Sequence, residues 1–136
     1  MYRIHIERIY MNALTKAEEQ VMQILWTRRE GFVKDLLEDF PDPKPAYNTV
    51  STIIRILEKK GFVEHRSFGK SHLYYPAISR DRYRQERFSN LMHDYFNNSM
   101  KQVLSHFGKS GSLDIKEADE IIEMMEALKQ KAESNE

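Results

Sequence analysis

The segment from residue 44 to residue 76 constrains the fold most, because a helix pattern with one apolar face leads directly into a basic hairpin pattern. At 100° per residue, the apolar side chains of residues 48–60 fall on one side of that helix. These are Val50, Ile53, Ile54 and Leu57. The opposite side carries hydroxyl, amide and cationic side chains, namely Asn48, Ser51, Thr52, Arg55 and Lys59. The first face can be buried, whereas the second can contact a hydrated surface.

Glycine and basic residues after this helix predict where it ends and which element comes next. Gly61 comes after two lysines, which suits a helix C-terminus because cations favour the negative end of the helix dipole and Gly tolerates the left-handed closing residue. The residues at positions 68–71, Phe-Gly-Lys-Ser, separate two short runs of strand character. They predict the turn of a β-hairpin.

Two shorter helices are predicted before residue 44. Thr15 and Glu18 have the spacing of a capping box and predict the start of a helix that ends near Thr27. A second helix is predicted from apolar residues between positions 33 and 40, and it stops at Pro41. Three helices followed by two strands is the order of a winged helix-turn-helix domain. We therefore expect a mainly α fold with a small β-hairpin wing over residues 13–78.

Beyond Pro76 the pattern changes to long helices. Residues 81–107 contain neither Pro nor Gly, and a break at residues 108–111 precedes a final amphipathic helix that begins near Asp114. The apolar stripes of this region are too wide for two surface helices, so we expect residues 79–136 to form a homodimer. The predicted interface residues are Phe88, Leu91, Met92, Tyr95, Phe96, Val103, Leu104, Phe107, Ile121, Ile122, Met125 and Leu128.

Charge and composition limit the classes of function. The net charge is zero, yet residues 43–72 carry +4 and residues 113–136 carry −5, which predicts a basic region separated from an acidic one. The absence of cysteine excludes disulfides and thiolate metal sites and fits a cytoplasmic protein. No phosphate-binding loop, nucleophile elbow or histidine spacing of a metal site is present, so we expect no enzyme activity, no metal and no cofactor.

The N-terminal residues 1–12 allow two interpretations. In the first, they are an extension, which is either disordered or the result of a misassigned start with Met11 as the true first residue. In the second, they form a short strand, because residues 2–7 alternate between apolar and polar side chains.

Several motifs together resemble the penicillinase repressor family, which includes the β-lactamase and methicillin-resistance repressors. They are residues 14–18 (LTKAE), 21–26 (VMQILW), 46–50 (AYNTV), 57–61 (LEKKG) and 72–76 (HLYYP). The resemblance covers roughly residues 13–132 in order and without large gaps. It implies a dimeric winged-helix repressor whose third helix enters the major groove of an inverted-repeat operator in double-stranded DNA, while the wing meets the DNA backbone.

Carried over by position, the resemblance implies DNA-binding roles on the third helix and on the wing. The helix residues are Asn48, Thr49, Ser51, Thr52 and Arg55, with Lys59 on the same polar face. The wing residues are Arg66, Lys70, Ser71 and His72. Their chemistry is suitable, because Arg can bind guanine bidentately, Asn can bind adenine, and hydroxyls serve bases or phosphates.

Two branches of the family differ in how repression is relieved. The copper-responsive branch uses clustered C-terminal cysteines, which this chain lacks. In another branch a membrane-bound sensor metalloprotease cuts between the DNA-binding and dimerisation parts. Residues 103–107 align with the cleaved region, which makes His106 and Phe107 the candidate cleavage site, although His106 stands where the family examples have Asn.

Two alternatives to a DNA-binding repressor of this family stay open. The winged helix could be a protein-interaction module without sequence-specific DNA binding. The chain could also be a ligand-sensing repressor of a different winged-helix group, which would need a cavity between its two parts.

Overall fold

The computed structural model describes residues 14–135, so both interpretations of residues 1–12 lie outside the described residues. The described chain forms two compact units, one ending at Asn90 and the other beginning at Leu91. The division falls inside a helix, α5 (Arg80–Phe96).

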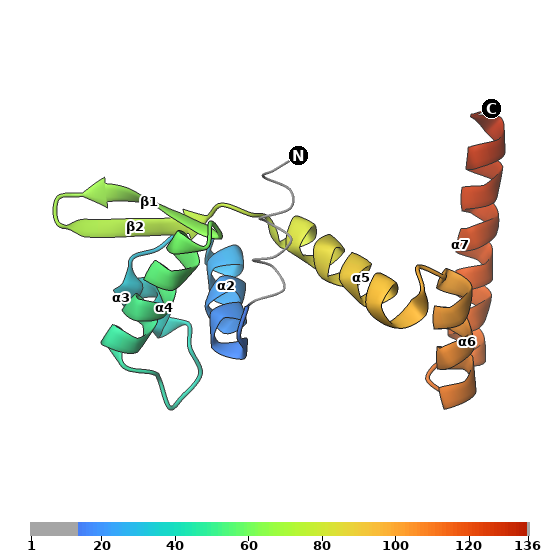
Figure 1. Cartoon of the computed structure of the whole chain (residues 1–136), viewed down its shortest axis with the longest axis horizontal. Coiled ribbons are helices and arrows are strands. Elements are labelled where there is room, and N and C mark those ends of the chain that lie inside the picture. The colour runs from blue at the N-terminus through green and yellow to red at the C-terminus, as the bar shows by residue number, and fades with distance from the viewer. Residues whose placement is uncertain (1–13, 136) are drawn as a thin grey trace. The chain divides into compact units, whose positions relative to one another are not determined.

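The first unit is a winged helix, as the sequence predicts. It contains α2 (Lys16–Arg28), α3 (Val33–Glu38), α4 (Tyr47–Lys59), β1 (Val63–Phe68), β2 (Ser71–Pro76) and the start of α5 (Figure 1). The strands pair antiparallel from Val63 opposite Pro76 to Phe68 opposite Ser71, so the turn consists of residues 69 and 70. Gly31 pairs with Tyr74 through two backbone hydrogen bonds of 2.9 Å, which form an isolated antiparallel bridge beside β2.

The predicted capping box at the start of α2 is present and is linked to α4. The Thr15 hydroxyl accepts from the Glu18 N–H at 3.1 Å, and the Glu18 carboxylate accepts from the Thr15 N–H at 2.9 Å. Lys60, which follows α4, donates to the same carboxylate at 2.8 Å. Burial alone would raise the pKa of Glu18, but hydrogen bonds from Lys60 and Thr15 outweigh it and hold that pKa below its ordinary value. A local capping signal therefore also joins two helices.

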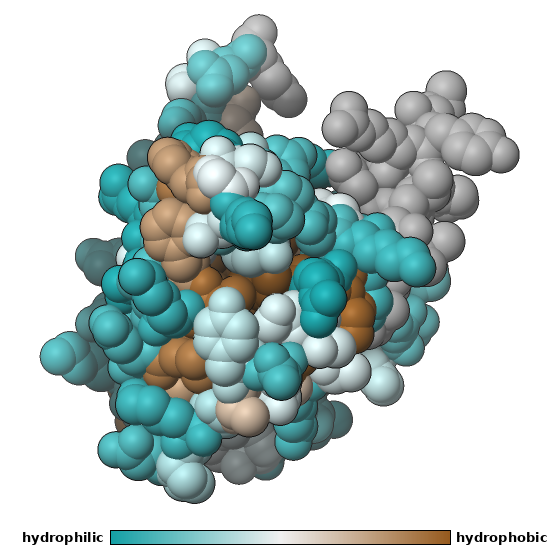
Figure 2. Space-filling view, turned by 90° about the vertical axis from the view of Figure 1, so that its left-hand side faces the viewer, coloured by the Kyte–Doolittle hydropathy of each residue, from teal (hydrophilic) through white to brown (hydrophobic). Residues whose placement is uncertain are grey.

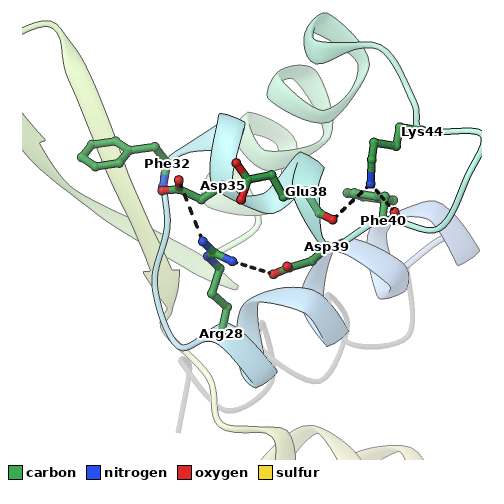
Figure 3. Close-up of polar contacts among 7 residues, drawn as sticks. All are labelled: Arg28, Phe32, Asp35, Glu38, Asp39, Phe40 and Lys44. Carbon is green, nitrogen blue, oxygen red and sulfur yellow. Dashed lines mark hydrogen bonds and ion pairs between the residues drawn. The ribbon is translucent and has the colours of Figure 1, made fainter.

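Polar side chains fix the short helix α3 between its neighbours. Arg28 of α2 lies between two acidic residues, 3.0 Å from the carboxylate of Asp39 and 3.9 Å from that of Asp35 (Figure 3). At the C-terminal end of α3, the Lys44 ammonium donates to the Phe40 carbonyl at 2.7 Å and to the Glu38 carbonyl at 3.1 Å. Lys44 thus offsets the partial negative charge of carbonyls at the C-terminal end of α3, although the sequence places it in the basic region of residues 43–72.

The hydrophobic core lies where α2, α3 and α4 meet the base of the wing. The side chains of Val50, Ile54 and Leu57 are completely buried, and Ile53 packs against the same core. This confirms the predicted apolar face of α4. Trp26 also packs there, and its indole N–H donates to the Ile78 carbonyl at 2.8 Å.

The second unit contains the end of α5, α6 (Met100–Ser110) and α7 (Ile115–Ser134). The sequence predicts no helix breaker within residues 81–107, and here the structure differs. Asn97 and Asn98 adopt positive φ angles of 52° and 59°, and Ser99 caps the next helix by accepting from the Gln102 N–H at 3.2 Å. Asn enters the left-handed region more readily than most residues, and Ser is a favoured N-cap, so this break has a local sequence signal.

The predicted break at residues 108–111 is wrong in its position. Gly108, Lys109 and Ser110 continue α6, and only Gly111, with φ of 75°, ends it. Asp114 then caps α7 by accepting from the Glu117 N–H at 2.7 Å. The candidate cleavage residues His106 and Phe107 therefore lie inside a regular helix.

No helix within residues 14–135 is both long enough and apolar enough to cross a membrane.

Candidate nucleic-acid interface

The polar face of α4 is open to solvent. Asn48, Thr49, Thr52, Arg55 and Lys59 are exposed, and Ser51 is half-buried. Because the opposite face is held in the core, α4 cannot rotate without exposing apolar side chains. Burial on one side therefore fixes the direction in which the predicted recognition residues point.

The first turn of α4 has no side-chain cap. Ala46 is the N-cap residue and offers no side-chain acceptor, whereas α2, α6 and α7 are each capped by a hydroxyl or a carboxylate. Uncapped N–H groups at a helix N-terminus form a favourable site for a phosphate oxygen. Tyr47, the first residue of α4, is 54% exposed and stands beside these groups.

Arg55 lies along the surface of its own helix. Its Nε donates to the Ser51 carbonyl at 3.3 Å, and a terminal nitrogen lies 3.5 Å from the Thr52 hydroxyl. These contacts are long and exposed, so the guanidinium can exchange them for a guanine edge or a phosphate at small cost.

A cleft of about 400 Å³ brings α4, α3 and the wing together. Its lining residues are Phe32, Val33, Lys34, Tyr47, Ser51, Lys70, Ser71, His72 and Tyr74. The predicted helix residue Ser51 thus shares a surface with three predicted wing residues. Figure 2 shows this side of the first unit, where hydrophilic residues surround a narrow strip of apolar ones. Lys34 and Tyr47 belong to the same surface but are absent from the sequence-based prediction, because only folding brings them to the wing.

The two predicted wing cations are in different environments. Lys70 is exposed at the turn and lines the cleft. Arg66 forms an ion pair with Glu30 at 2.6 Å, and its guanidinium lies 5.5 Å from the centre of the Tyr75 ring. Side chains alternate between the two faces of a strand, so Arg66 points away from the face of its neighbour His65, which contacts Glu58 of α4. The structure thus separates Arg66 from the α4 side of the wing.

The two wing histidines pack on each other. The rings of His65 and His72 are stacked, with centres 4.0 Å apart and planes at 5°. Among residues 14–135, no group of three or more histidine or acidic side chains is arranged to hold a metal ion. This stacked pair leaves the exposed edge of His72 at the cleft.

The predicted dimerisation residues are placed unevenly. Met92 and Val103 are buried, and Phe96 and Ile121 are half-buried. The remaining members are between 38% and 75% exposed, namely Phe88, Leu91, Tyr95, Leu104, Phe107, Ile122, Met125 and Leu128. The helix α7 contains no buried residue at all. Apolar side chains this large and this exposed are left uncovered by the described residues of a single chain.

Comparison with known proteins identifies a family and individual relatives. The sequence model of the penicillinase repressor family matches residues 14–127. The methicillin resistance regulatory protein MecI of Staphylococcus aureus (strain N315) is 24% identical over 119 residues, which cover 87% of this chain and 94% of that protein. The penicillinase repressor of Bacillus licheniformis is 20% identical over 117 residues, covering 85% of this chain and 91% of that protein. A solved structure of a mutant of ZitR from Lactococcus lactis covers 89% of this chain and 77% of its own, with 9% identity and a TM-score of 0.41.

The helix order, the hairpin and the core define a winged-helix protein. Since the family model covers most of the chain, the chain belongs to the penicillinase repressor family. That family consists of transcriptional repressors, so a repressor role is supported and the expectation that the chain is not an enzyme is confirmed.

Proposed function

We propose that the chain represses transcription by binding an inverted-repeat operator in duplex DNA as a homodimer. The observation that carries the proposal is the orientation of α4. Its apolar side is locked in the core, while its amide, hydroxyl and guanidinium groups face solvent beside the wing. A helix of this kind fits the major groove, whose base edges present a distinct pattern of donors and acceptors.

Each part of the surface has a role that its chemistry suits. Asn48, Ser51 and Thr52 lie in the N-terminal half of α4 and would read base edges, with Arg55 one turn further along. The uncapped N–H groups of the first turn and the Lys70 ammonium would bind phosphates. Lys59, Ser71 and His72 add exposed polar groups at the margins of the same surface.

The homodimer would form through the second unit. Its exposed apolar side chains need a cover, and a second copy of the same surface supplies one with two-fold symmetry. Two-fold symmetry in the protein matches an inverted repeat in the DNA. A dimeric repressor of this kind would act in the cytoplasm.

Proteolysis by a membrane-bound sensor metalloprotease would relieve repression. The proposed site, His106 and Phe107, lies in α6, so α6 must unwind locally before the bond enters a protease. Cutting there would detach α7, weaken the dimer and remove the avidity of two linked half-site contacts.

Gly108 offers a test of this unwinding step. It is helical, and a Cβ at this position would meet nothing within 4 Å, so Gly108→Ala should stabilise the end of α6 by about 1 kcal/mol. Nicking between residues 105 and 112 by a general protease should then slow roughly fivefold. Mass spectrometry of early fragments measures this, and Lys109→Ala serves as a control on the same turn. Unchanged nicking in Gly108→Ala would mean that unwinding of α6 does not limit cleavage.

Gel shifts with fragments from upstream of the gene test the function itself. The protein should shift a fragment with an inverted repeat at lower concentration than a scrambled duplex of equal length. Equal affinity for both would refute operator binding and favour the protein-interaction alternative.

A further inference from the structure

A second cleft, of about 520 Å³, lies between α2 and the start of α5. Its lining residues are Glu19, Gln23 and Trp26 of α2 and Arg80, Tyr83, Arg84 and Arg87 of α5. All of them belong to the first unit. In Figure 1, α4 and the start of α5 lie on either side of α2, so this cleft is separate from the surface proposed to bind DNA. We propose that the cleft binds a small phosphate- or carboxylate-bearing molecule.

The lining of the cleft carries an excess of positive charge. Three guanidinium groups face one carboxylate, that of Glu19, which already accepts a hydrogen bond from the Tyr83 hydroxyl at 2.7 Å. Among the described residues, Arg80 and Arg87 have no ion pair with any carboxylate. Within residues 14–135, the one carboxylate that Arg84 reaches is that of Asp81, at 3.7 Å, and both side chains are largely exposed. Arginines at i, i+4 and i+7 repel one another, and a bound anion would remove that repulsion.

Arg80 is held in place before any ligand arrives. A terminal nitrogen donates to the Thr27 hydroxyl at 2.8 Å and to the Gln23 carbonyl at 3.4 Å. The guanidinium lies 5.9 Å from the centre of the Trp26 ring, and the Nε is buried without a hydrogen-bond partner among residues 14–135. A cation held by neutral groups alone is poorly compensated, and an anion in the cleft would supply the missing charge.

The chemistry of the lining selects the class of ligand. Guanidinium groups bind carboxylates and phosphates through paired hydrogen bonds, and they bind them better than chloride because the fork of N–H donors matches two oxygens. The rings of Trp26 and Tyr83, with centres 5.3 Å apart, give the cleft an apolar wall. A cleft of this volume accepts a small organic anion rather than a polymer.

Trp26 makes the proposal testable, because it is the only tryptophan in the chain and it lines the cleft. Its fluorescence should be recorded for the full chain at constant ionic strength, with chloride replaced stepwise by inorganic phosphate in one arm and by citrate in another. We expect a saturable change in at least one arm, and the arm with the tighter midpoint identifies the preferred anion class. A response that is linear in both arms, or absent from both, would overturn the proposal.

Matched variants separate binding in the cleft from a general ionic effect. Arg84→Gln and Arg87→Gln should each raise the anion concentration at the midpoint of the titration tenfold or more. Arg82→Gln removes an exposed arginine from the same helix that does not line the cleft, and it should stay within twofold of the original protein. Equal weakening in all three would overturn the proposal. The titration contains no DNA, so its outcome is independent of whether an operator is found.

Discussion

The two wing cations should contribute unequally to DNA binding, although the sequence predicts the same role for both. Lys70 is exposed at the turn and shares the cleft with Ser51 of α4. Arg66 is paired with Glu30 at 2.6 Å and points to the other face of the hairpin. We therefore expect Lys70→Ala to weaken binding and Arg66→Ala to leave it nearly unchanged.

The expected magnitude is set by counterion release. Each phosphate contact contributes about 0.9 to the magnitude of the slope of log K against log salt concentration. A homodimer contains two copies of Lys70, so Lys70→Ala should reduce the magnitude of that slope by roughly 1.8. Between 50 and 200 mM salt, the original protein should then lose about tenfold more affinity than Lys70→Ala. Arg66 would reach a phosphate only after leaving Glu30, and an exposed pair of this kind stabilises by up to about 1 kcal/mol. The slope for Arg66→Ala should therefore stay at its original value.

Fluorescence anisotropy with a labelled operator duplex and a scrambled duplex, at several salt concentrations, measures both slopes. Lys70→Ala should weaken both duplexes by the same factor, because phosphates carry no sequence information. An equal drop in slope for Arg66→Ala would refute the assignment of the two wing faces, since it would mean that Glu30 releases Arg66 to the DNA.

Three other predictions concern base reading, the capping box and the dimer. Asn48→Ala and Arg55→Ala should each reduce the preference for operator over scrambled duplex by about 1–3 kcal/mol, as measured in the same anisotropy assay. An unchanged preference would contradict the proposal that α4 lies in the major groove. Glu18→Gln should lower the free energy of unfolding by about 1–3 kcal/mol at neutral pH, because a charged acceptor of buried hydrogen bonds is lost. Because folding lowers the pKa of Glu18, the difference in unfolding free energy between the two proteins should be fully present above pH 4.5 and should shrink as the pH falls through the pKa of the folded state. Urea unfolding at several pH values measures this difference, and a difference independent of pH would contradict the ion pair. Leu104 is 38% exposed, and Leu104→Ala should weaken the dimer by about 1 kcal/mol per protomer in sedimentation equilibrium, whereas Ile56→Ala, on the first unit, should not.

The helices and strands of the first unit could be predicted from the sequence because their signals are local. The capping box of Thr15 and Glu18, the two faces of α4 and the turn at residues 69 and 70 each depend on a few neighbouring residues. The same kind of signal was available at Asn97 and Asn98, where two residues that tolerate positive φ precede a serine cap. The pattern of apolar residues runs through this point without interruption, so the absence of Pro and Gly proved a poor guide to helix continuity.

The sequence by itself also determined which α4 side chains face outward, because a 3.6-residue period that buries one face must expose the other. Only the tertiary structure decided which partners the outward groups meet. The pair of Arg66 with Glu30 joins residues 36 positions apart, and Lys60 reaches Glu18 across 42 positions. The Arg80 contact with Thr27 spans 53 positions, and it builds a cleft that no local motif predicts. Such contacts depend on how the helices pack. Periodicity and capping act within one or two turns of chain, whereas packing depends on the shapes of surfaces far apart in the sequence.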